Sequence, residues 1–489
     1  MKNKPQKSLG LNAFFNSLQS LLNLIFPLIT FPYISRVLSV DGVGKYNFAN
    51  SINSYFLLLA GLGISTYAVR EGAKFRDDRK KFSDFASKIF TLNLFSMLMS
   101  YGLLFIILIV AQPLHKYVVA ILIFSIQIFF TTIGTDWVYT IFEEYGYITI
   151  RNVIFKIISI VLLFMFVRNS NDYLNYVMIT VFASSGSYAL NFIHARKFCD
   201  IKINIRFDWK IYLIPILVIF ASNVAIQLYV SSDVTLLGFL AGNHSVGIYS
   251  TAVRIYQIAT QVLTAMLVVT VPRLSMLMGQ KKFTKYKETL KNLVNTLVLI
   301  VFPGITGLFM LSKNVVLLIA GEKYVDSTVP LQILCLAIIG SAMSTIFNQC
   351  VLLPAKREKK TLISTIISAI VNIALNFALI PLFLENGPAI TTLLSEIIMM
   401  IMNFYFSRDI VAYIFKDKEF WYNSLVVIVG CLAIILICII CKLFFKGFVV
   451  NLILSIIFST LGYAIIVFLL KNTIANSLLN VVCKIKLEK

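Results

Sequence analysis

The sequence VGKYNFANSI at residues 43–52 returns 203 residues later as VGIYSTAVRI at residues 246–255, with five of the ten positions identical. Each copy follows a short loop and opens an apolar segment long enough to cross a bilayer. The two segments are the second and the eighth of the chain, so both copies have the same orientation. The repeat predicts two six-helix lobes, 1–207 and 208–410, related by a pseudo-twofold axis along the membrane normal, with residues 411–489 appended.

The composition places the chain in a membrane. Of its 489 residues, 59% are apolar and 13% are charged, whereas about a quarter of the residues of a soluble protein carry charge. Apolar segments of about 20 residues recur along the whole chain. They predict an all-α polytopic membrane protein with about 14 transmembrane helices, near residues 10–35, 46–68, 88–111, 117–142, 148–167, 173–195, 212–236, 246–271, 291–312, 330–353, 361–383, 387–407, 421–441 and 448–470.

The net charge of +21 indicates an oriented membrane protein rather than a nucleic-acid partner, because no polar domain exists to hold nucleic acid. If the N-terminus is cytoplasmic, 34 of the 43 Lys and Arg residues fall in cytoplasmic segments or in the first turns of the spans that follow them, and 8 fall in external loops. Short cytoplasmic loops retain Lys and Arg. The pattern therefore predicts a multi-pass protein of the bacterial cytoplasmic membrane with both termini cytoplasmic.

Several kinds of chemistry are disfavoured. The seven cysteines lack paired metal-ligand spacings, and we interpret them as small hydrophobic residues. Gly42-Val43-Gly44-Lys45 has Ser39 where a P-loop would carry its first glycine. No large external loop or acidic catalytic cluster is present in the sequence. We therefore expect no enzyme activity, no metal site and no cofactor.

Polar residues follow one helical face in four of the predicted spans. Such residues are costly in a bilayer unless they face protein or water. Span 1 carries Asn12, Asn16, Gln19 and Asn23, and span 2 carries Asn47, Asn50 and Ser54. Span 7 carries Asn223, Gln227 and Ser231, and span 8 carries Ser250, Arg254, Gln257 and Gln261. Interhelical hydrogen bonding would account for any one of these residues. Four stripes on the first two helices of each lobe favour a hydrated, substrate-binding cavity.

Basic residues in or near the spans are candidates for contact with an anionic substrate. Arg254 is a cation inside a span, where it either snorkels or pairs within the protein, or else meets phosphate oxygens bidentately. Arg36 and Arg70 lie at the ends of spans 1 and 2, and Lys156 lies about two turns into span 5. End positions also suit orientation charges.

A second group of polar residues suggests coupling to a cation. Asp233 lies in span 7, Asn372 and Asn376 share a face of span 11, and Thr392 lies near the start of span 12. Carboxylate, amide and hydroxyl oxygens suit Na⁺, and Asp233 alone would suit proton relay. Helix packing is the alternative interpretation for each residue.

Several motifs, in this order along the chain, resemble one family. They are FPYISRVL at 31–38, GVGKY at 42–46, GLG at 61–63, YAVRE at 67–71, Asp136-Trp137 with Glu143, Arg151-Asn152, and GPAI at 387–390 with Glu396. They resemble the polysaccharide-transport group, with its Wzx-like repeat-unit flippases, of the multidrug/oligosaccharidyl-lipid/polysaccharide flippase superfamily.

This resemblance implies two six-helix lobes around a cavity that opens to either side of the membrane in turn. It implies a flippase for undecaprenyl-diphosphate-linked oligosaccharide repeat units that serve capsule, O-antigen or related polymers. The expected partners are the lipid-linked oligosaccharide, membrane lipids and polysaccharide polymerase machinery. The Asp233, Asn372, Asn376 and Thr392 set is similar to a cation site of some superfamily members, although Asn376 stands where a second carboxylate is expected. A cation-coupled multidrug exporter of the same fold and a peptidoglycan or teichoic-acid precursor flippase are the alternatives.

Overall fold

The computed structural model describes residues 9–476, which form helices and connecting segments without a strand. The chain divides into two compact units, Met1–Gly247 and Ile248–Lys489. The all-helical fold class predicted from the sequence is confirmed. The predicted lobe boundaries at 207/208 and 410/411 remain predictions.

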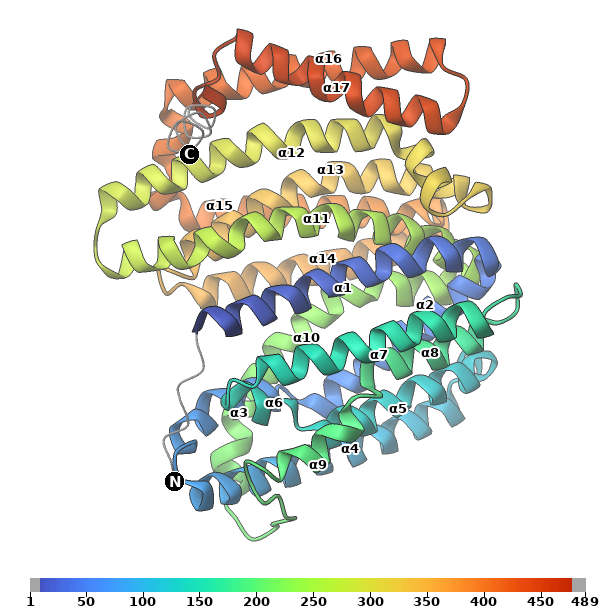
Figure 1. Ribbon diagram of the computed structural model, residues 1–489, viewed down its shortest axis with the longest axis vertical. Coiled ribbons are helices and arrows are strands. Elements are labelled where there is room, and N and C mark those ends of the chain that lie inside the picture. The colour runs from blue at the N-terminus through green and yellow to red at the C-terminus, as the bar shows by residue number, and fades with distance from the viewer. Residues whose placement is uncertain (1–8, 477–489) are drawn as a thin grey trace. The chain divides into compact units, whose positions relative to one another are not determined.

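The first unit holds the helices coloured blue to green in Figure 1. In chain order they are α1 (Leu9–Val37), α2 (Val40–Gly61), α3 (Ile64–Gly72), η1 (Ala73–Phe75), α4 (Arg79–Val110), η2 (Gln112–Tyr117), α5 (Val118–Gly134), α6 (Asp136–Ile141), α7 (Tyr145–Phe166), α8 (Tyr173–Ser185), α9 (Tyr188–Ala195), α10 (Trp209–Leu240) and the start of α11 (Gly242–Gly279).

The second unit continues from α11. Its further elements are α12 (Phe283–Ile319), η3 (Glu322–Ser327), α13 (Thr328–Thr345), the π-helix η4 (Ile346–Leu352), α14 (Glu358–Phe383), α15 (Asn386–Lys416), α16 (Lys418–Phe444) and α17 (Phe448–Leu469).

Twelve helical segments of the described chain are long and apolar enough to cross a membrane, judged by length and composition. They coincide with twelve of the fourteen predicted spans. The other two predicted spans, 10–35 and 246–271, lie over α1 and α11. Exposed Leu, Ile, Val and Phe side chains are abundant along these helices, which is the surface that bilayer hydrocarbon would cover.

Three of these spans in the first unit are broken rather than continuous. Span 2 turns at Leu62 and Gly63, which both have positive φ angles of 44° and 76°, and α3 follows. Span 4 turns at Thr135, with φ 42°, between α5 and α6. Span 6 is interrupted between α8 and α9. Backbone amides and carbonyls at such breaks need new partners, so breaks within spans commonly lie beside polar side chains.

The repeated VG motifs meet in space inside the first unit. A Cβ atom added to Gly44 would lie 1.9 Å from the carbonyl oxygen of Asn243, and one added to Gly247 would lie 2.3 Å from that of Val40. Val40 and Asn243 are 203 residues apart, as are Gly44 and Gly247. Such reciprocal contact is what a twofold axis produces. The starts of α2 and α11 therefore cross at a local pseudo-twofold axis, and glycine permits their backbones to touch.

In the second unit, α15 packs against α13 and α14, and α16 and α17 pack as a pair against α12 (Figure 1). The Tyr463 hydroxyl donates to the Leu299 carbonyl at 2.6 Å, which joins α17 to α12. Lys291 of α12 forms ion pairs with Asp417 and Glu419 at the start of α16. These polar contacts fix the appended helix pair on α12.

Candidate functional site

The polar stripes predicted on spans 2 and 7 meet along a seam between α2 and α10. The amide Nε2 of Gln227 donates to Ser54 Oγ at 2.8 Å and to Ser231 Oγ at 2.6 Å. Further along, Thr235 Oγ1 donates to Ser51 Oγ at 3.1 Å and lies 3.1 Å from the Tyr55 hydroxyl. Predicted stripe residues and their neighbours therefore satisfy one another across two helices. The hydrogen-bond interpretation holds for this part of the stripes.

The remaining polar residues of α2 do not join the seam. The amide of Asn47 donates to the Val43 carbonyl of its own helix at 2.9 Å, and it is half-buried. Asn50 is exposed. Both therefore keep polar surface available to solvent or to a ligand.

The stripe of α1 is only partly described. Asn12 is buried and Gln19 is half-buried, whereas the side chains of Asn16 and Asn23 lie outside the described residues. This helix packs on α7, where the Thr149 hydroxyl donates to the Phe15 carbonyl at 3.1 Å. Lys156 of α7 lies over the Phe26 ring, 5.7 Å from its centroid. Lys156 therefore faces α1.

Polar groups of the α11 stripe lack hydrogen-bond partners among the described residues. Arg254 is half-buried and makes no hydrogen bond or ion pair with the part of the chain that the structure describes. The Ser250 hydroxyl is buried and lacks a hydrogen-bond partner there too. Gln257 is half-buried and Gln261 is exposed. A buried or half-buried polar group needs a partner, which water or a bound polar ligand would supply.

Two further predicted basic residues lie at helix ends. Arg36 is exposed in the last turn of α1. Arg70 is exposed near the end of α3, and its Nε donates to Glu71 at 3.1 Å. Such exposed neighbour pairs are weak, so Arg70 keeps its charge available.

The predicted cation group divides between the two units. Asn376 Nδ2 donates to Asn372 Oδ1 at 3.1 Å, and Thr391 Oγ1 donates to Asn376 Oδ1 at 2.9 Å, all in the buried interface of α14 and α15. Thr391 joins this cluster, and the hydroxyl of the predicted Thr392 lies 3.4 Å from that of Tyr249. Asp233 is buried in α10 of the first unit.

A charged network in the first unit was not predicted as a site. Arg151 of α7 lies 3.5 Å from Asp136 of α6, measured from Nη2 to Oδ1, with only 4% of the Arg151 side chain exposed. Asn191 of α9 accepts from Arg151 and donates to Asp136. The network therefore joins spans 4, 5 and 6 beside the breaks in spans 4 and 6. Two members of this network, Asp136 and Arg151, belong to the motifs that carry the family resemblance, but the sequence does not show that they contact one another.

The second unit carries a neutral counterpart. Asn403 of α15 accepts from the Ser364 hydroxyl at 2.6 Å and donates to Ser344 Oγ at 2.9 Å. These residues lie on the tenth, eleventh and twelfth spans, beside the π-helix η4. Asn191 and Asn403 are 212 residues apart, close to the repeat offset of 203. In each unit one asparagine therefore links three corresponding spans, and among the described residues only Asn191 of the first unit bonds both members of an ion pair.

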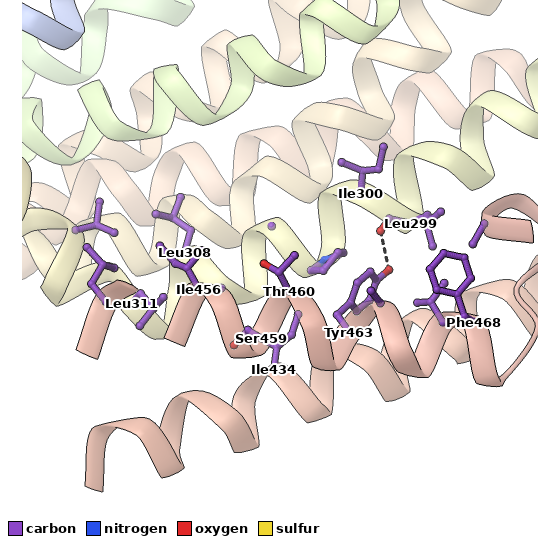
Figure 2. A pocket seen from close by; sticks show the side chains of 18 residues that line it. Leu299, Ile300, Leu308, Leu311, Ile434, Ile456, Ser459, Thr460, Tyr463 and Phe468 are labelled. Atoms are coloured by element: carbon purple, nitrogen blue, oxygen red, sulfur yellow. Dashed lines mark hydrogen bonds between the residues drawn. The ribbon is translucent and has the colours of Figure 1, made fainter. Parts of the chain in front are cut away.

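An apolar cavity of about 690 Å³ lies in the second unit between α12 and α17 (Figure 2). Its lining includes Leu299, Leu308, Ile456 and Phe468, with the hydroxyls of Ser459 and Thr460 as minor polar groups. None of the lining residues within the described part of the chain is charged. Hydrocarbon would suit this cavity, whereas an anionic group would lose its hydration there without compensation. The candidate polar site is therefore elsewhere, on the stripes.

Comparison with known families gives two matches. The model of the family described as polysaccharide biosynthesis protein matches residues 9–278, which is more than half of the chain. The MatE family model matches residues 218–378.

Two relatives match along most of their lengths. A protein named as a proposed O-antigen transporter in Escherichia coli (strain K12) is 23% identical over 415 residues, covering 83% of this chain and 98% of that protein. The capsular polysaccharide biosynthesis protein CapF of Staphylococcus aureus is 22% identical over 385 residues, covering 77% and 93%.

Among solved structures, the lipid II flippase MurJ in an inward closed conformation superposes with a TM-score of 0.73 at 16% identity, covering 93% of this chain and 99% of MurJ. An inward-facing multidrug resistance MATE family transporter gives a TM-score of 0.63 at 15% identity, covering 82% and 96%. At these identities the likeness establishes the fold. The twelve apolar helices and the family match together indicate a multi-pass inner membrane protein.

Proposed function

Since the chain belongs to the polysaccharide biosynthesis protein family, we propose that it is a flippase for undecaprenyl-diphosphate-linked oligosaccharide repeat units. The product would serve capsule, O-antigen or a related surface polysaccharide, in keeping with the names of the two relatives. Translocation would proceed by alternating access, with no chemical step. Polysaccharide polymerase machinery would take up the flipped unit.

The observation that carries this proposal is the polar face of α11. Arg254 is a half-buried cation without a counter-ion among the described residues. A guanidinium offers two parallel donors to phosphate oxygens. Arg254 would therefore bind the diphosphate. Arg36 and Arg70 would attract it at the ends of the spans.

The amides of the stripes would bind the sugar part of the substrate. Amide and hydroxyl groups donate and accept hydrogen bonds, as sugar hydroxyls do. We assign this role to Asn16, Gln19, Asn23, Asn47, Asn50, Gln227, Gln257 and Gln261. Gln227, which is held by Ser54 and Ser231, would have to exchange those bonds for substrate.

Orientation follows from the Lys and Arg distribution: both termini would be cytoplasmic. The lobes would be residues 1–207 and 208–410, and residues 411–489 would be appended. The reciprocal backbone contacts of Gly44 and Gly247, both within the first unit, are in keeping with a repeat at an offset of 203 residues.

Coupling to Na⁺ or H⁺ would use Asp233, Asn372, Asn376 and Thr392. The neutral oxygens of the α14–α15 cluster are hard ligands of the kind Na⁺ accepts, but they already bond one another, so an ion would have to replace those bonds. Asp233→Asn should abolish any dependence of flipping on Na⁺ or pH. An unchanged ion response in that variant would remove Asp233 from the mechanism.

One observation favours a second candidate, a cation-coupled multidrug exporter: the MatE family model matches residues 218–378. A peptidoglycan or teichoic-acid precursor flippase would share the diphosphate chemistry. The exporter would require an acidic cavity for cationic drugs, whereas the stripes carry Arg254.

Gene deletion separates these functions. We expect lipid-linked oligosaccharide to accumulate on the cytoplasmic face of the membrane, with loss of surface polysaccharide and restoration of both by this chain. Unchanged intermediates and normal polymer, in a strain without a second flippase, would reject the repeat-unit proposal. Drug accumulation in the same deletion strain would then support the exporter.

A further inference from the structure

The segment that joins span 6 to span 7 is extended and lies against α4. The backbone amides of Asp200, Lys202 and Asn204 donate to Ser83 Oγ, Ser87 Oγ and Thr91 Oγ1 at 3.0, 3.0 and 2.9 Å. Every second residue of the segment thus meets every fourth residue of α4. The spacing matches because two extended residues span about 6.6 Å and four helical residues about 6.0 Å.

This fixed segment forms one wall of a cavity of about 300 Å³ beside the end of α9. Phe192, Cys199 and Ile201 contribute apolar surface, and Arg196 and Lys202 contribute cationic side chains. The Ala195 carbonyl, at the end of α9, already accepts from the amides of Phe198 and Cys199. The lining is nevertheless mostly polar.

The charges of the cavity are unequal. Asp200, its acidic residue, is paired with Arg79 at 3.4 Å. The side chains of Arg196 and Lys202 form no ion pair or hydrogen bond with the described part of the chain, and both are exposed. Two cations therefore remain without a counter-ion among the described residues, in a cavity whose lining segment is held in place by hydrogen bonds to α4.

Three exposed isoleucines lie within three residues in sequence of residues that line the cavity. Ile193 is 68% exposed, Ile203 is 63% exposed and Ile205 is 61% exposed. In a chain that spans a membrane, such exposed apolar side chains are suited to contact with acyl chains. A cationic pocket bordered by exposed isoleucines has the two-part character of a lipid: a charged head and a hydrocarbon tail.

We propose that this cavity binds the phosphate headgroup of an anionic phospholipid of the bilayer, with Arg196 and Lys202 as its ligands and the tails against the three isoleucines. This site is separate from the polar stripes and does not depend on the proposed transport activity. The bound lipid would brace the connection between α9 and α10, because Lys202 belongs both to the cavity and to the bonded segment.

The test uses the full-length chain, purified in detergent and titrated with phosphatidylglycerol or phosphatidylcholine, with retained lipid counted by native mass spectrometry. Each basic residue near anionic lipid contributes about 1 kcal/mol, so the double variant Arg196→Ala/Lys202→Ala should bind phosphatidylglycerol about thirtyfold more weakly. Arg196→Lys/Lys202→Arg should largely retain binding. Lys359→Ala/Lys416→Ala removes two exposed charges that are not among the residues lining the cavity and should leave binding unchanged.

Three results would overturn the proposal. The first is equal retention of phosphatidylglycerol by the native chain and the alanine double variant. The second is equal retention of phosphatidylcholine and phosphatidylglycerol by the native chain. The third is displacement of phosphatidylglycerol by polyprenyl phosphate at equal concentration, which would assign the cavity to the isoprenoid lipid instead. A fall in binding in the alanine double variant with normal retention in the lysine–arginine exchange would support it, even if the alanine variant is less stable.

Discussion

The polar network around Asn191 in the first unit should contribute more to stability than the network around Asn403 in the second unit. Asp136→Leu would leave the Arg151 guanidinium, whose side chain is 4% exposed, without its carboxylate partner. Removing one member of a buried pair costs about 3–5 kcal/mol. Because 39% of the Asp136 side chain is exposed and water reaches it, we expect the lower end, about 3 kcal/mol. Asn403→Leu removes neutral bonds to two hydroxyls and should cost about 1–2 kcal/mol.

The free energy of unfolding of both variants can be compared by SDS titration of the purified protein in mixed micelles. Asp136→Leu/Arg151→Met removes both charges and should recover part of the loss, because replacing a whole buried pair by apolar residues is often neutral. Two results would refute the reasoning: equal losses in Asp136→Leu and Asn403→Leu, or a double variant less stable than Asp136→Leu alone.

Three further changes test other features. Arg254→Ala should lower transport about 10–100-fold at matched protein level, the value of one or two charge-assisted hydrogen bonds, and normal polysaccharide export in cells would exclude Arg254 from binding. Gly44→Ala should cost about 1–3 kcal/mol of stability because the methyl meets the Asn243 carbonyl, whereas Gly61→Ala in the same helix meets nothing within 4 Å; equal melting temperatures would contradict the crossing. The hydrogen bond from Lys291 lowers the pKa of Asp417, so its stabilisation is present above the ordinary carboxylate pKa and lost as pH falls through the lowered one. Asp417→Asn should flatten this acid-side loss in a melting series against pH, and an unchanged profile would count against the pair.

The spans were predictable because hydrocarbon thickness sets a length that every spanning helix must reach. The breaks within spans were not. Leu62 and Thr135 adopt positive φ angles, and neither residue type signals that conformation in a sequence. Tertiary packing imposes these turns, so a search for apolar segments passes over them.

The sequence predicted which candidate site residues share a helical face, but it did not predict which of them bond to one another across helices. Periodicity placed Ser54, Gln227 and Ser231 on stripes, yet only the fold shows that α2 and α10 bring them together. Thr391 bonds the amide cluster but was not predicted to, because neighbouring residues of a helix point about 100° apart and the pattern alone does not show which of them faces α14. Asn191 gave no signal, since a single asparagine within a span is common.

The hydrogen bonds from the backbone of residues 200–204 to the hydroxyls of α4 have a consequence for how the chain is synthesised and inserted. Ser83, Ser87 and Thr91 are synthesised before residues 200–204 that bond to them. As the chain emerges, the joining segment can dock on a helix already inserted in the membrane. The start of α10 is therefore placed by earlier helices before the second unit exists. A substitution that removes these hydrogen bonds would therefore act during biogenesis, by misplacing α10 and the helices after it, rather than by damaging the finished protein.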